Sequence, residues 1–332
     1  MATYKGVKGF TIQTIAGDPP APALGQVWYN TTSNVLKGFL NAAGAWSAGG
    51  NMNNATRQQQ GAGTQTAGLN IGGYNNPGSP SHAAVFTEKY DGTSWTEVNS
   101  LNDARYAGMG CGTQTAAMTA TGNHPVTTYV PQTEIYDGTS WTESGEVLAA
   151  RGDTEGCGIS TAALMCGGTP PSVRRNTSIF NGTSWTDTNS LVADAVGSNC
   201  IGTTTAAICV GGGGSPGGSD RTESWNGSSW TEVNDLNTAR RGAGSSGIST
   251  AGIFATGWTA PDTATPAVEQ WNGTCWTEVG DVANATAFVI GASNAPSSLS
   301  LIFGGDPPSA GDTVVTEEWN ASPEAVVTFT SS

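Results

Sequence analysis

A short phrase that ends in tryptophan recurs along the chain and constrains the fold more than any other feature. Three of the six copies read Asp-Gly-Thr-Ser-Trp or Asn-Gly-Thr-Ser-Trp and the others are variants, and the phrases end at Trp46, Trp95, Trp141, Trp185, Trp230 and Trp276. Successive tryptophans are 44 to 49 residues apart. A repeat of this length is typical of β-propellers and of helical arrays, so the chain should consist of similar units packed side by side.

Each repeat contains signals for two β-hairpins. A second aromatic residue lies five positions before the last five of these tryptophans, at Tyr90, Tyr136, Phe180, Trp225 and Trp271. The Asp-Gly or Asn-Gly between the two aromatics is a strong hairpin signal, because both residues tolerate positive φ. A second apolar hairpin, such as Gly-Ile-Ser-Thr-Ala-Ala-Leu-Met-Cys166, fills the rest of the period. Four short strands per repeat predict a propeller blade rather than a helix pair.

Counting the hairpins predicts the number of blades. Six inner hairpins begin near Gly61, Gly108, Glu155, Ser198, Gly242 and Phe288. Seven outer strand pairs are present, from Val35–Trp46 to Val314–Trp319. The surplus indicates that strands from the two chain ends meet in one blade and close the ring. We therefore expect an all-β, six-bladed β-propeller over residues 34–332, preceded by an N-terminal extension over residues 1–33.

The composition excludes several classes of protein. The net charge is −14, with 26 acidic and 12 basic residues, so a nucleic-acid backbone would be repelled. Eleven tryptophans at regular spacing argue against disorder. No apolar run approaches the ~20 residues that span a bilayer, and residues 1–6 lack the apolar segment of a signal peptide. The chain is therefore expected to be made in the cytoplasm and not inserted into a membrane.

The order Gly-Gly, aromatic residue, tryptophan and arginine resembles the Kelch repeat over roughly residues 34–330, with a shorter distance from aromatic to tryptophan. The phrases Gly-Thr-Gln-Thr-Ala-Gly-Leu and Asn-Gly-Thr-Ser-Trp also resemble proteins of marine tailed phages. A leader similar to Gly17-Asp-Pro-Pro and Gly25-Gln-Val-Trp-Tyr-Asn precedes the propeller in those proteins. The resemblance covers the repeats and the leader and includes no catalytic motif.

This resemblance implies a non-enzymatic virion protein located in a tail fibre, a tail tip or the capsid surface. The N-terminal segment would attach the propeller to other virion proteins, in several copies per particle. The propeller would bind a host surface glycan, a receptor or another protein. The alternative is a carbohydrate-active enzyme or lectin of the Kelch-propeller type. A cluster of carboxylates or metal ligands at one mouth of the propeller would favour that alternative.

The residues that could carry catalysis or bind a metal have simpler structural explanations. The two histidines, His82 and His124, lie in loop sequence, and metal sites need several preorganised ligands. We therefore predict no metal, no cofactor and no enzymatic activity. Five glutamates precede the first aromatic of a repeat by two residues, at Glu88, Glu134, Glu223, Glu269 and Glu317. Because they recur in nearly every repeat, they should pair with Arg105, Arg151, Arg240 or backbone N–H groups, although a glycosidase would need only two of them.

The six cysteines should be reduced, buried thiols, because the chain is made in the cytoplasm. Two pairs, Cys157/Cys166 and Cys200/Cys209, each lie in one inner hairpin. Disulfides within these hairpins remain the alternative.

Binding is expected where the repeats differ. The segment after each Gly-Gly changes in length and composition, and alternate connections of a four-stranded meander emerge on one face. Bulky or polar residues in these segments are the candidate binding residues, since Tyr, Trp and Arg are enriched at interface hot spots. They are Tyr74, His82, Tyr129, Arg174, Arg175 and Trp258.

Overall fold

The computed structural model describes residues 12–20, 26–41, 44–75, 83–124, 128–213, 218–308, 311–321 and 324–329. The chain forms two compact units, one of residues 45–320 and one of residues 1–44 with 321–332. The described part consists of β-strands and loops, with a single 3-10 turn at Pro171–Val173. The predicted all-β class is therefore confirmed. None of the described residues forms a helix long and apolar enough to cross a membrane.

Residues 45–320 contain six four-stranded antiparallel sheets, five of them built from consecutive repeats. The first three sheets are formed by β5 (Gln60–Thr64), β6 (Ala67–Ile71), β7 (Thr87–Tyr90), β8 (Trp95–Val98); β9 (Met109–Thr113), β10 (Ala116–Ala120), β11 (Thr133–Tyr136), β12 (Trp141–Ser144); and β13 (Glu155–Ile159), β14 (Ala162–Cys166), β15 (Thr177–Phe180), β16 (Trp185–Thr188). The next two are formed by β17 (Asn199–Gly202), β18 (Ala207–Val210), β19 (Thr222–Trp225), β20 (Trp230–Glu232); and β21 (Gly244–Ile248), β22 (Ala251–Ala255), β25 (Val268–Trp271), β26 (Trp276–Val279). A short hairpin of β23 (Trp258–Thr259) and β24 (Thr263–Ala264) lies in the loop between β22 and β25.

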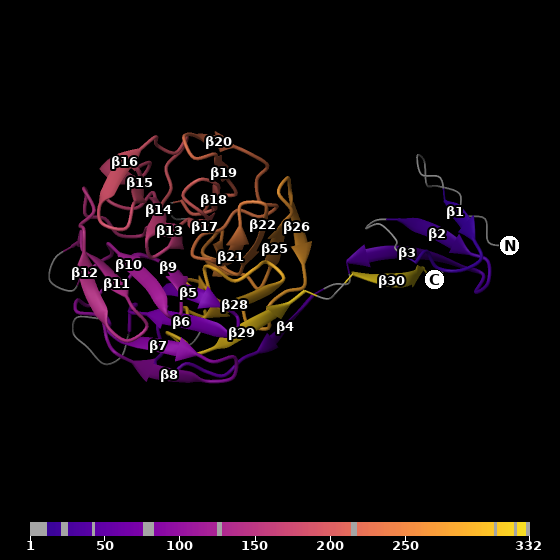
Figure 1. Cartoon of the computed structure of the whole chain (residues 1–332), viewed down its shortest axis with the longest axis horizontal. Helices are drawn as coiled ribbons and strands as arrows, with labels where there is room; N and C mark the ends of the chain where they lie inside the picture. Colours follow the sequence, from indigo (N-terminus) through magenta and orange to yellow (C-terminus); the bar gives the residue numbers. More distant parts are fainter. Residues whose placement is uncertain are drawn as a thin grey trace. The chain divides into compact units, whose positions relative to one another are not determined.

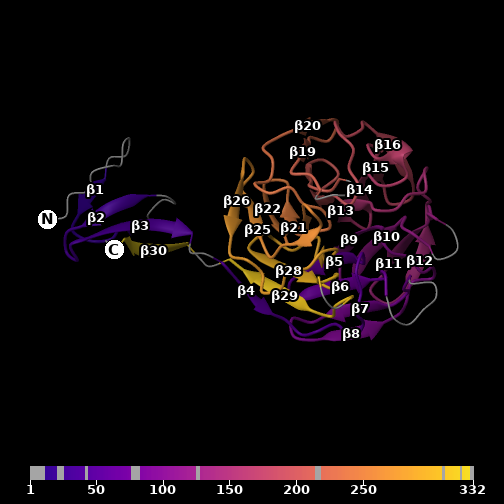
Figure 2. The same cartoon turned by 180° about the vertical axis from the view of Figure 1, so that it is seen from behind.

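The sixth sheet combines the two ends of this unit. Its strands are β27 (Ile290–Gly291), β28 (Leu299–Phe303), β29 (Thr316–Asn320) and β4 (Ala45–Ala48). Trp319 of β29 lies directly opposite Trp46 of β4. Strands from both chain ends therefore share a sheet. Figures 1 and 2 show the first strand of each consecutive sheet near the centre and the fourth at the rim.

The second unit differs from the predicted N-terminal extension. Its sheet has the order β1 (Gln13–Ile15), β2 (Val27–Asn30), β3 (Val35–Asn41) and β30 (Glu324–Phe329). The residues from Val35 to Asn41 were expected in the propeller, yet they pair with β2 and with the C-terminal strand. The structure thus divides the chain near residues 44 and 321, and not between residues 33 and 34.

Asp18 explains why the leader folds with these strands. Its carboxylate accepts hydrogen bonds from Trp28 Nε1 at 3.1 Å and Asn30 Nδ2 at 2.7 Å, and Lys37 Nζ lies 2.8 Å away. These bonds, of which the one to Lys37 contributes most, lower the pKa of Asp18. The Gly-Asp-Pro-Pro leader, β2 and β3 are therefore joined by one charged group.

The core of the larger unit lies between neighbouring sheets. Tyr90 and Trp95 are directly opposite each other on β7 and β8, and the other repeats pair their two aromatics in the same way.

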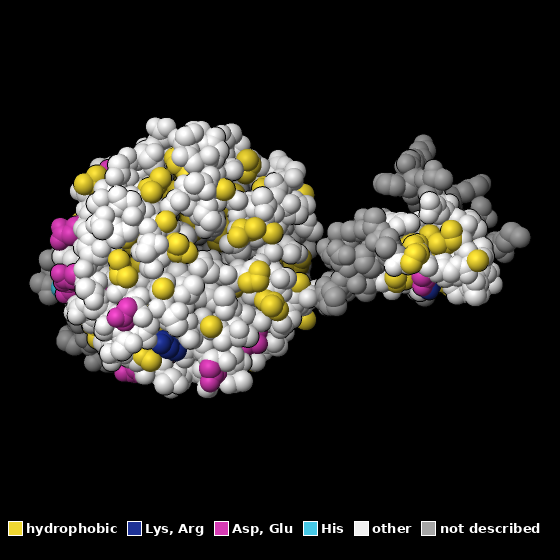
Figure 3. Space-filling model, in the orientation of Figure 1, with side chains coloured by type: hydrophobic (Ala, Val, Ile, Leu, Met, Phe, Trp, Pro, Cys, Tyr) yellow, Lys and Arg dark blue, Asp and Glu magenta, His cyan; other side chains and the backbone are white. Residues whose placement is uncertain are grey.

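The Asp-Gly turns differ from the expectation in one respect, because only the glycine, such as Gly92, has a positive φ. The Asp91 carboxylate instead accepts hydrogen bonds from the N–H groups of Thr93 and Ser94. Charged side chains are sparse on the face that Figure 3 shows.

Candidate functional site

Six equivalent residues with positive φ surround the point where the first strands of the six sheets begin. They are Gln58, Ala107, Asp153, Gly197, Gly242 and Phe288. Backbone hydrogen bonds join each segment to the next: Ala107 N donates to Gln58 O, Thr154 N to Ala107 O, Gly197 N to Asp153 O, Gly242 N to Gly197 O, Phe288 N to Gly242 O and Gln58 N to Phe288 O. The donors and acceptors are 2.6 to 3.4 Å apart. The cycle returns to its starting residue and frames a common mouth.

A cavity opens at this mouth. Its volume is about 410 Å³ when the open entrance is included. Apolar residues such as Phe288 line it together with polar side chains from three sheets, among them Gln58, Asp153, Glu155 and Asn199. The space that water-sized groups can occupy is about 50 Å³, which is room for a few water molecules or the tip of a side chain.

Two carboxyl groups in the cavity are less acidic than usual. Burial raises the pKa of Asp153, although a hydrogen bond of 3.0 Å from Thr169 Oγ1 opposes this effect. Burial also raises the pKa of Glu155 to about 8. Glu155 is therefore mostly protonated at neutral pH and can donate a hydrogen bond. The two residues are two positions apart on one chain segment, so they come from the same side of the cavity.

An arginine and an aromatic ring stack beside the mouth at the first sheet. The Arg57 guanidinium lies 4.4 Å from the centre of the Tyr74 ring. Its Nη1 atom is 2.9 Å from Asp306 and 3.3 Å from Asp312. The two carboxylates hold the guanidinium in place, and its stacking on the ring fixes the orientation of the tyrosine.

The fifth sheet repeats this arrangement. The Arg241 guanidinium lies 4.9 Å from the centre of the Trp258 ring, and Asp262 is 3.2 Å from Arg241 Nη2. Trp258 also packs edge-to-face on Phe288, with the ring centres 4.8 Å apart. The cavity therefore has a rigid aromatic group on its rim at two separate sheets.

The variable loops join the second strand of each sheet to the third, and their described residues lie around this mouth. In five sheets the loop forms a bridge to the residue before the positive-φ position, and the bridges are Arg57–Tyr74, Tyr106–Asn123, Gly152–Thr169, Arg241–Trp258 and Ala287–Asp306. In the fourth sheet, Gly213 N donates to Val196 O. The loops thus share one end of the sheets, as the alternation of connections predicts.

The structure separates the predicted binding residues into two groups. Tyr74 and Trp258 lie on the rim, and Tyr129 is half-buried in the neighbouring loop. Arg174 and Arg175 instead contact a connector, the segment that links the last strand of one sheet to the first strand of the next, here β16 to β17. Arg174 is 3.7 Å from Asp194, and Arg175 Nε donates to Leu191 O. His82 lies outside the described residues.

Several residues of the site were not predicted. Gln58, Asp153 and Phe288 belong to the positive-φ positions, and Arg57 and Arg241 hold the aromatic rings. The sequence does contain a signal for them, because they lie one or two residues after the connector position that Arg105, Arg151 and Arg240 occupy. Aligning the repeats on these arginines would have identified the residues that line the mouth.

The recurring glutamates have the predicted structural role. Arg105 Nη2 lies 2.7 Å from Glu134 Oε1, Arg240 pairs with Glu269, and Arg151 pairs with Ser178. Where the arginine is absent, Glu223 accepts from the backbone N–H groups of Val192 and Ala193. In the described ranges, no three His, Cys, Asp or Glu side chains are arranged to hold a metal ion.

Comparisons with known proteins identify the fold alone. No family model and no curated protein match the sequence. Among solved structures, that of YjhT superposes with a TM-score of 0.66, covering 84% of this chain and 99% of YjhT at 11% identity. YjhT is a β-propeller, and this likeness supports the same fold here.

Proposed function

We propose that this protein is a non-enzymatic virion component of a tailed phage, in a tail fibre, tail tip or capsid surface. Its residues 45–320 would form a closed, six-bladed propeller of Kelch-like repeats. The variable loops around the mouth would bind a host surface glycan or another protein. The smaller unit would attach the propeller to other virion proteins.

The cycle of backbone hydrogen bonds supports a closed ring. It passes through all six sheets and returns to the first, and β4 pairs with β29 to complete the sheet that joins the two chain ends. In such a ring, the loops around the axis have fixed positions because they emerge from a rigid scaffold.

The observation that carries the binding role is the paired arrangement of aromatic rings on the rim. Tyr74 and Trp258 are each fixed by an arginine whose charge is balanced by aspartate. Rigid aromatic side chains lose little conformational entropy when they bind, and rings on a polar rim suit the apolar face of a sugar or a flat peptide segment.

Binding of the purified protein to intact host cells tests this proposal. Trp258→Ala and Tyr74→Ala should each weaken binding at least about tenfold, corresponding to roughly 1.4 kcal/mol. Ile248→Ala is the matched control, because this exposed residue lies at the tip of the β21–β22 hairpin, at the opposite end of the sheet. Equal effects of rim and control variants would contradict binding by the rim.

Asp153 and Glu155 favour a second candidate, a carbohydrate-active enzyme or lectin. Carboxyl groups do line the mouth, and the raised pKa of Glu155 suits a proton donor. However, a glycosidase places its two carboxyl groups on opposite sides of the sugar, whereas these two come from one segment. Incubating the protein with host surface polysaccharide tests the enzyme: cleavage that Glu155→Gln abolishes would support it, whereas binding without cleavage agrees with the non-enzymatic role proposed above and with a lectin.

A further inference from the structure

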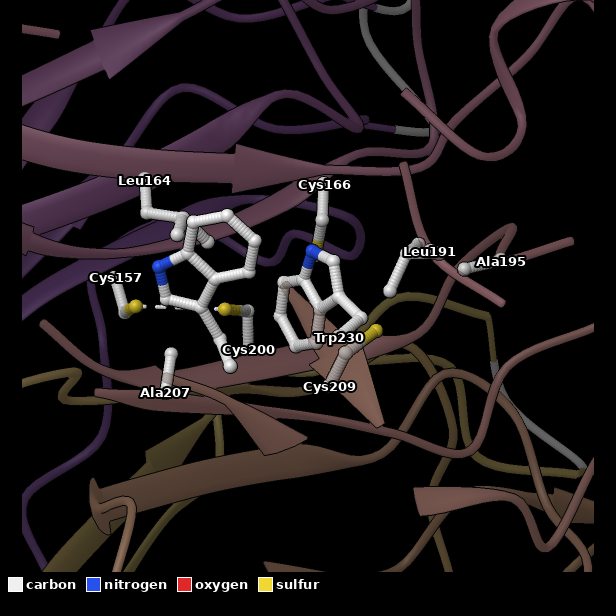
Figure 4. Close-up of a cluster of buried hydrophobic side chains, with 10 residues drawn as sticks. Cys157, Leu164, Cys166, Leu191, Ala195, Cys200, Ala207, Cys209 and Trp230 are labelled. Carbon is white, nitrogen blue, oxygen red and sulfur yellow. Dashed lines mark hydrogen bonds between the residues drawn. The ribbon is translucent and has the colours of Figure 1, made fainter. Parts of the chain in front are cut away.

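Four cysteines gather in one buried cluster between the third and fourth sheets, away from the loop residues described above. Cys157 and Cys166 lie on β13 and β14, and Cys200 and Cys209 lie on β17 and β18. Figure 4 shows the four thiols among Leu164, Leu191 and Trp230. The sulfur atoms of Cys157 and Cys200 are 3.4 Å apart.

The repeat explains why these two thiols face each other. Cys200 occupies a position that is glycine in the first three sheets, at Gly61, Gly110 and Gly156. A Cβ atom on Gly61 would lie 2.4 Å from the Gly291 carbonyl oxygen, so the neighbouring sheet leaves no room there. In the fourth sheet this position faces the third sheet and carries a side chain, which contacts Cys157.

The other two cysteines extend the contact across the same interface. The Cys166 thiol interacts with both Cys200 and Cys209. Pairing Cys157 with Cys200 therefore leaves Cys166 beside Cys209, and both pairs join different sheets. Within the hairpin of the third sheet, Cys157 lies opposite Leu164 and Cys166 lies opposite Glu155, so its two cysteines are not cross-strand partners. In the fourth sheet Cys200 lies opposite Cys209, so a disulfide within that hairpin is the competing pairing.

We propose that Cys157 and Cys200 are an oxidation site at which a peroxide forms a disulfide between the third and fourth sheets. One thiolate attacks a peroxide oxygen, the O–O bond breaks, and a sulfenic acid and water form. The second thiolate attacks the sulfenic sulfur, and its hydroxyl leaves as water. Two thiols and one hydrogen peroxide thus give one disulfide and two waters.

Burial controls the rate of this reaction. The thiolate is the reactive form, and the contact with the Cys157 thiol, together with burial, raises the pKa of Cys200 well above its ordinary value. Oxidation therefore requires transient opening of the interface and is slow compared with that of Cys275, which is exposed. Cys275→Ser removes this competing thiol and prevents links between molecules.

Trypsin distinguishes the possible pairings because Arg174 and Arg175 lie between the two hairpins. Cleavage after Arg151, Arg174, Arg175 and Arg221 places Cys157 and Cys166 on residues 152–174 and Cys200 and Cys209 on residues 176–221. The full-length Cys275→Ser protein is treated with hydrogen peroxide, alkylated under denaturing conditions and digested without reduction. The proposal predicts that mass spectrometry finds the two peptides linked and that fragmentation assigns the link to Cys157 and Cys200.

Two variants and a melting curve complete the test. Cys166→Ala with Cys209→Ser leaves only Cys157 and Cys200 on the two peptides and should retain the link, and loss of the link in this variant would overturn the proposal. Oxidation should raise the melting temperature by roughly 5–10 °C, since the bond constrains the unfolded chain. Cys111→Ala, at the position equivalent to Cys157 in the second sheet, should still gain the link. Separate peptides that each lack two hydrogens, or thiols that all remain alkylated, would overturn the proposal.

Discussion

A single hydrogen bond repeated from sheet to sheet explains why the tryptophan of each phrase recurs. The indole N–H of Trp141 donates to Thr87 Oγ1 of the preceding sheet at 3.0 Å. Trp95, Trp185, Trp230 and Trp276 donate in the same way to Thr316, Thr133, Thr177 and Thr222. All five tryptophans are buried. They therefore both fill the space between sheets and fix the contact through a polar group.

Trp141→Ala should lower the free energy of unfolding by about 3–5 kcal/mol, because it leaves a large cavity between the first and second sheets. Chemical denaturation measures the loss. Thr87→Val isolates the hydrogen bond and should cost about 1–3 kcal/mol, since it leaves a buried N–H group without a partner. Equal stability of Trp141→Ala and the parent would refute the assignment of this residue to the core.

The sixth sheet lacks this hydrogen bond, and a substitution should restore it. The indole N–H of Trp46 is buried and has no hydrogen-bond partner within the described residues. Where the other sheets provide threonine, the fifth sheet has Val268. Val268→Thr should stabilise the protein by about 1 kcal/mol. The gain should disappear in a Trp46→Phe background, and a gain that persists there would have another cause.

Glu155 predicts a pH dependence of stability. Its ordinary pKa of 4.5 rises to about 8 in the folded protein, so the folded state binds more protons than the unfolded state between these values. Stability should therefore decrease as the pH rises through this range. Glu155→Gln removes the effect, and its advantage over the parent should grow from pH 4.5 to pH 8 and then level off. Parallel curves for the two proteins would show that Glu155 is not buried in this way.

At the scale of whole elements, buried charges attach each connector to the strand that follows it. Arg105 is fully buried and lies 2.7 Å from Glu134, which also accepts from the backbone N–H of Asn102. Glu134→Ala should therefore cost about 3–5 kcal/mol, because it leaves the arginine charge unpaired. Denaturation of the variant measures this cost.

The third sheet supplies a comparison for that variant. There Arg151 pairs with Ser178, whose hydroxyl donates to Asp187 at 2.6 Å. Glu143 takes the position of Asp187 in the second sheet, so Glu134→Ser should cost less than Glu134→Ala. If both substitutions cost the same, the serine and the second carboxylate do not compensate for the lost charge.

The repeats made the strands of the larger unit predictable, whereas the ends of the chain were not. Paired aromatics and Asp-Gly turns recur, so comparison of copies separates what the fold requires from what varies. Val35–Asn41 occurs once, so no other copy shows which strands it should pair with. Its true partners, β2 and the C-terminal strand, depend on Asp18 and on contacts distant in sequence. The rim residues Tyr74 and Trp258 were predicted by their type, but the cavity behind them depends on backbone conformation at Gln58 and its equivalents.

At the scale of the whole molecule, the chain passes between the two units twice, and the strands on either side of these crossings pair with each other within each unit. Asn41 pairs with Glu324 in the smaller unit, and Ala45 pairs with Asn320 in the larger one. Both ends of the chain thus belong to the unit that we propose as the attachment point. Removing only residues 1–32 would separate β3 and β30 from β2, so a clean separation requires cuts on both sides.

A protein of residues 45–320 should therefore fold alone and fail to join the particle. Its six sheets and the contacts between them lie within these residues, so its melting temperature should remain within a few degrees of the parent value. A matched protein of residues 50–320 lacks β4, which removes Trp46 from its position opposite Trp319 and exposes the edge of the sixth sheet. That protein should unfold at a lower temperature or aggregate, as scanning calorimetry would measure. Equal stability of the two would show that β4 is dispensable, and particles that incorporate residues 45–320 normally would rule out attachment through the smaller unit.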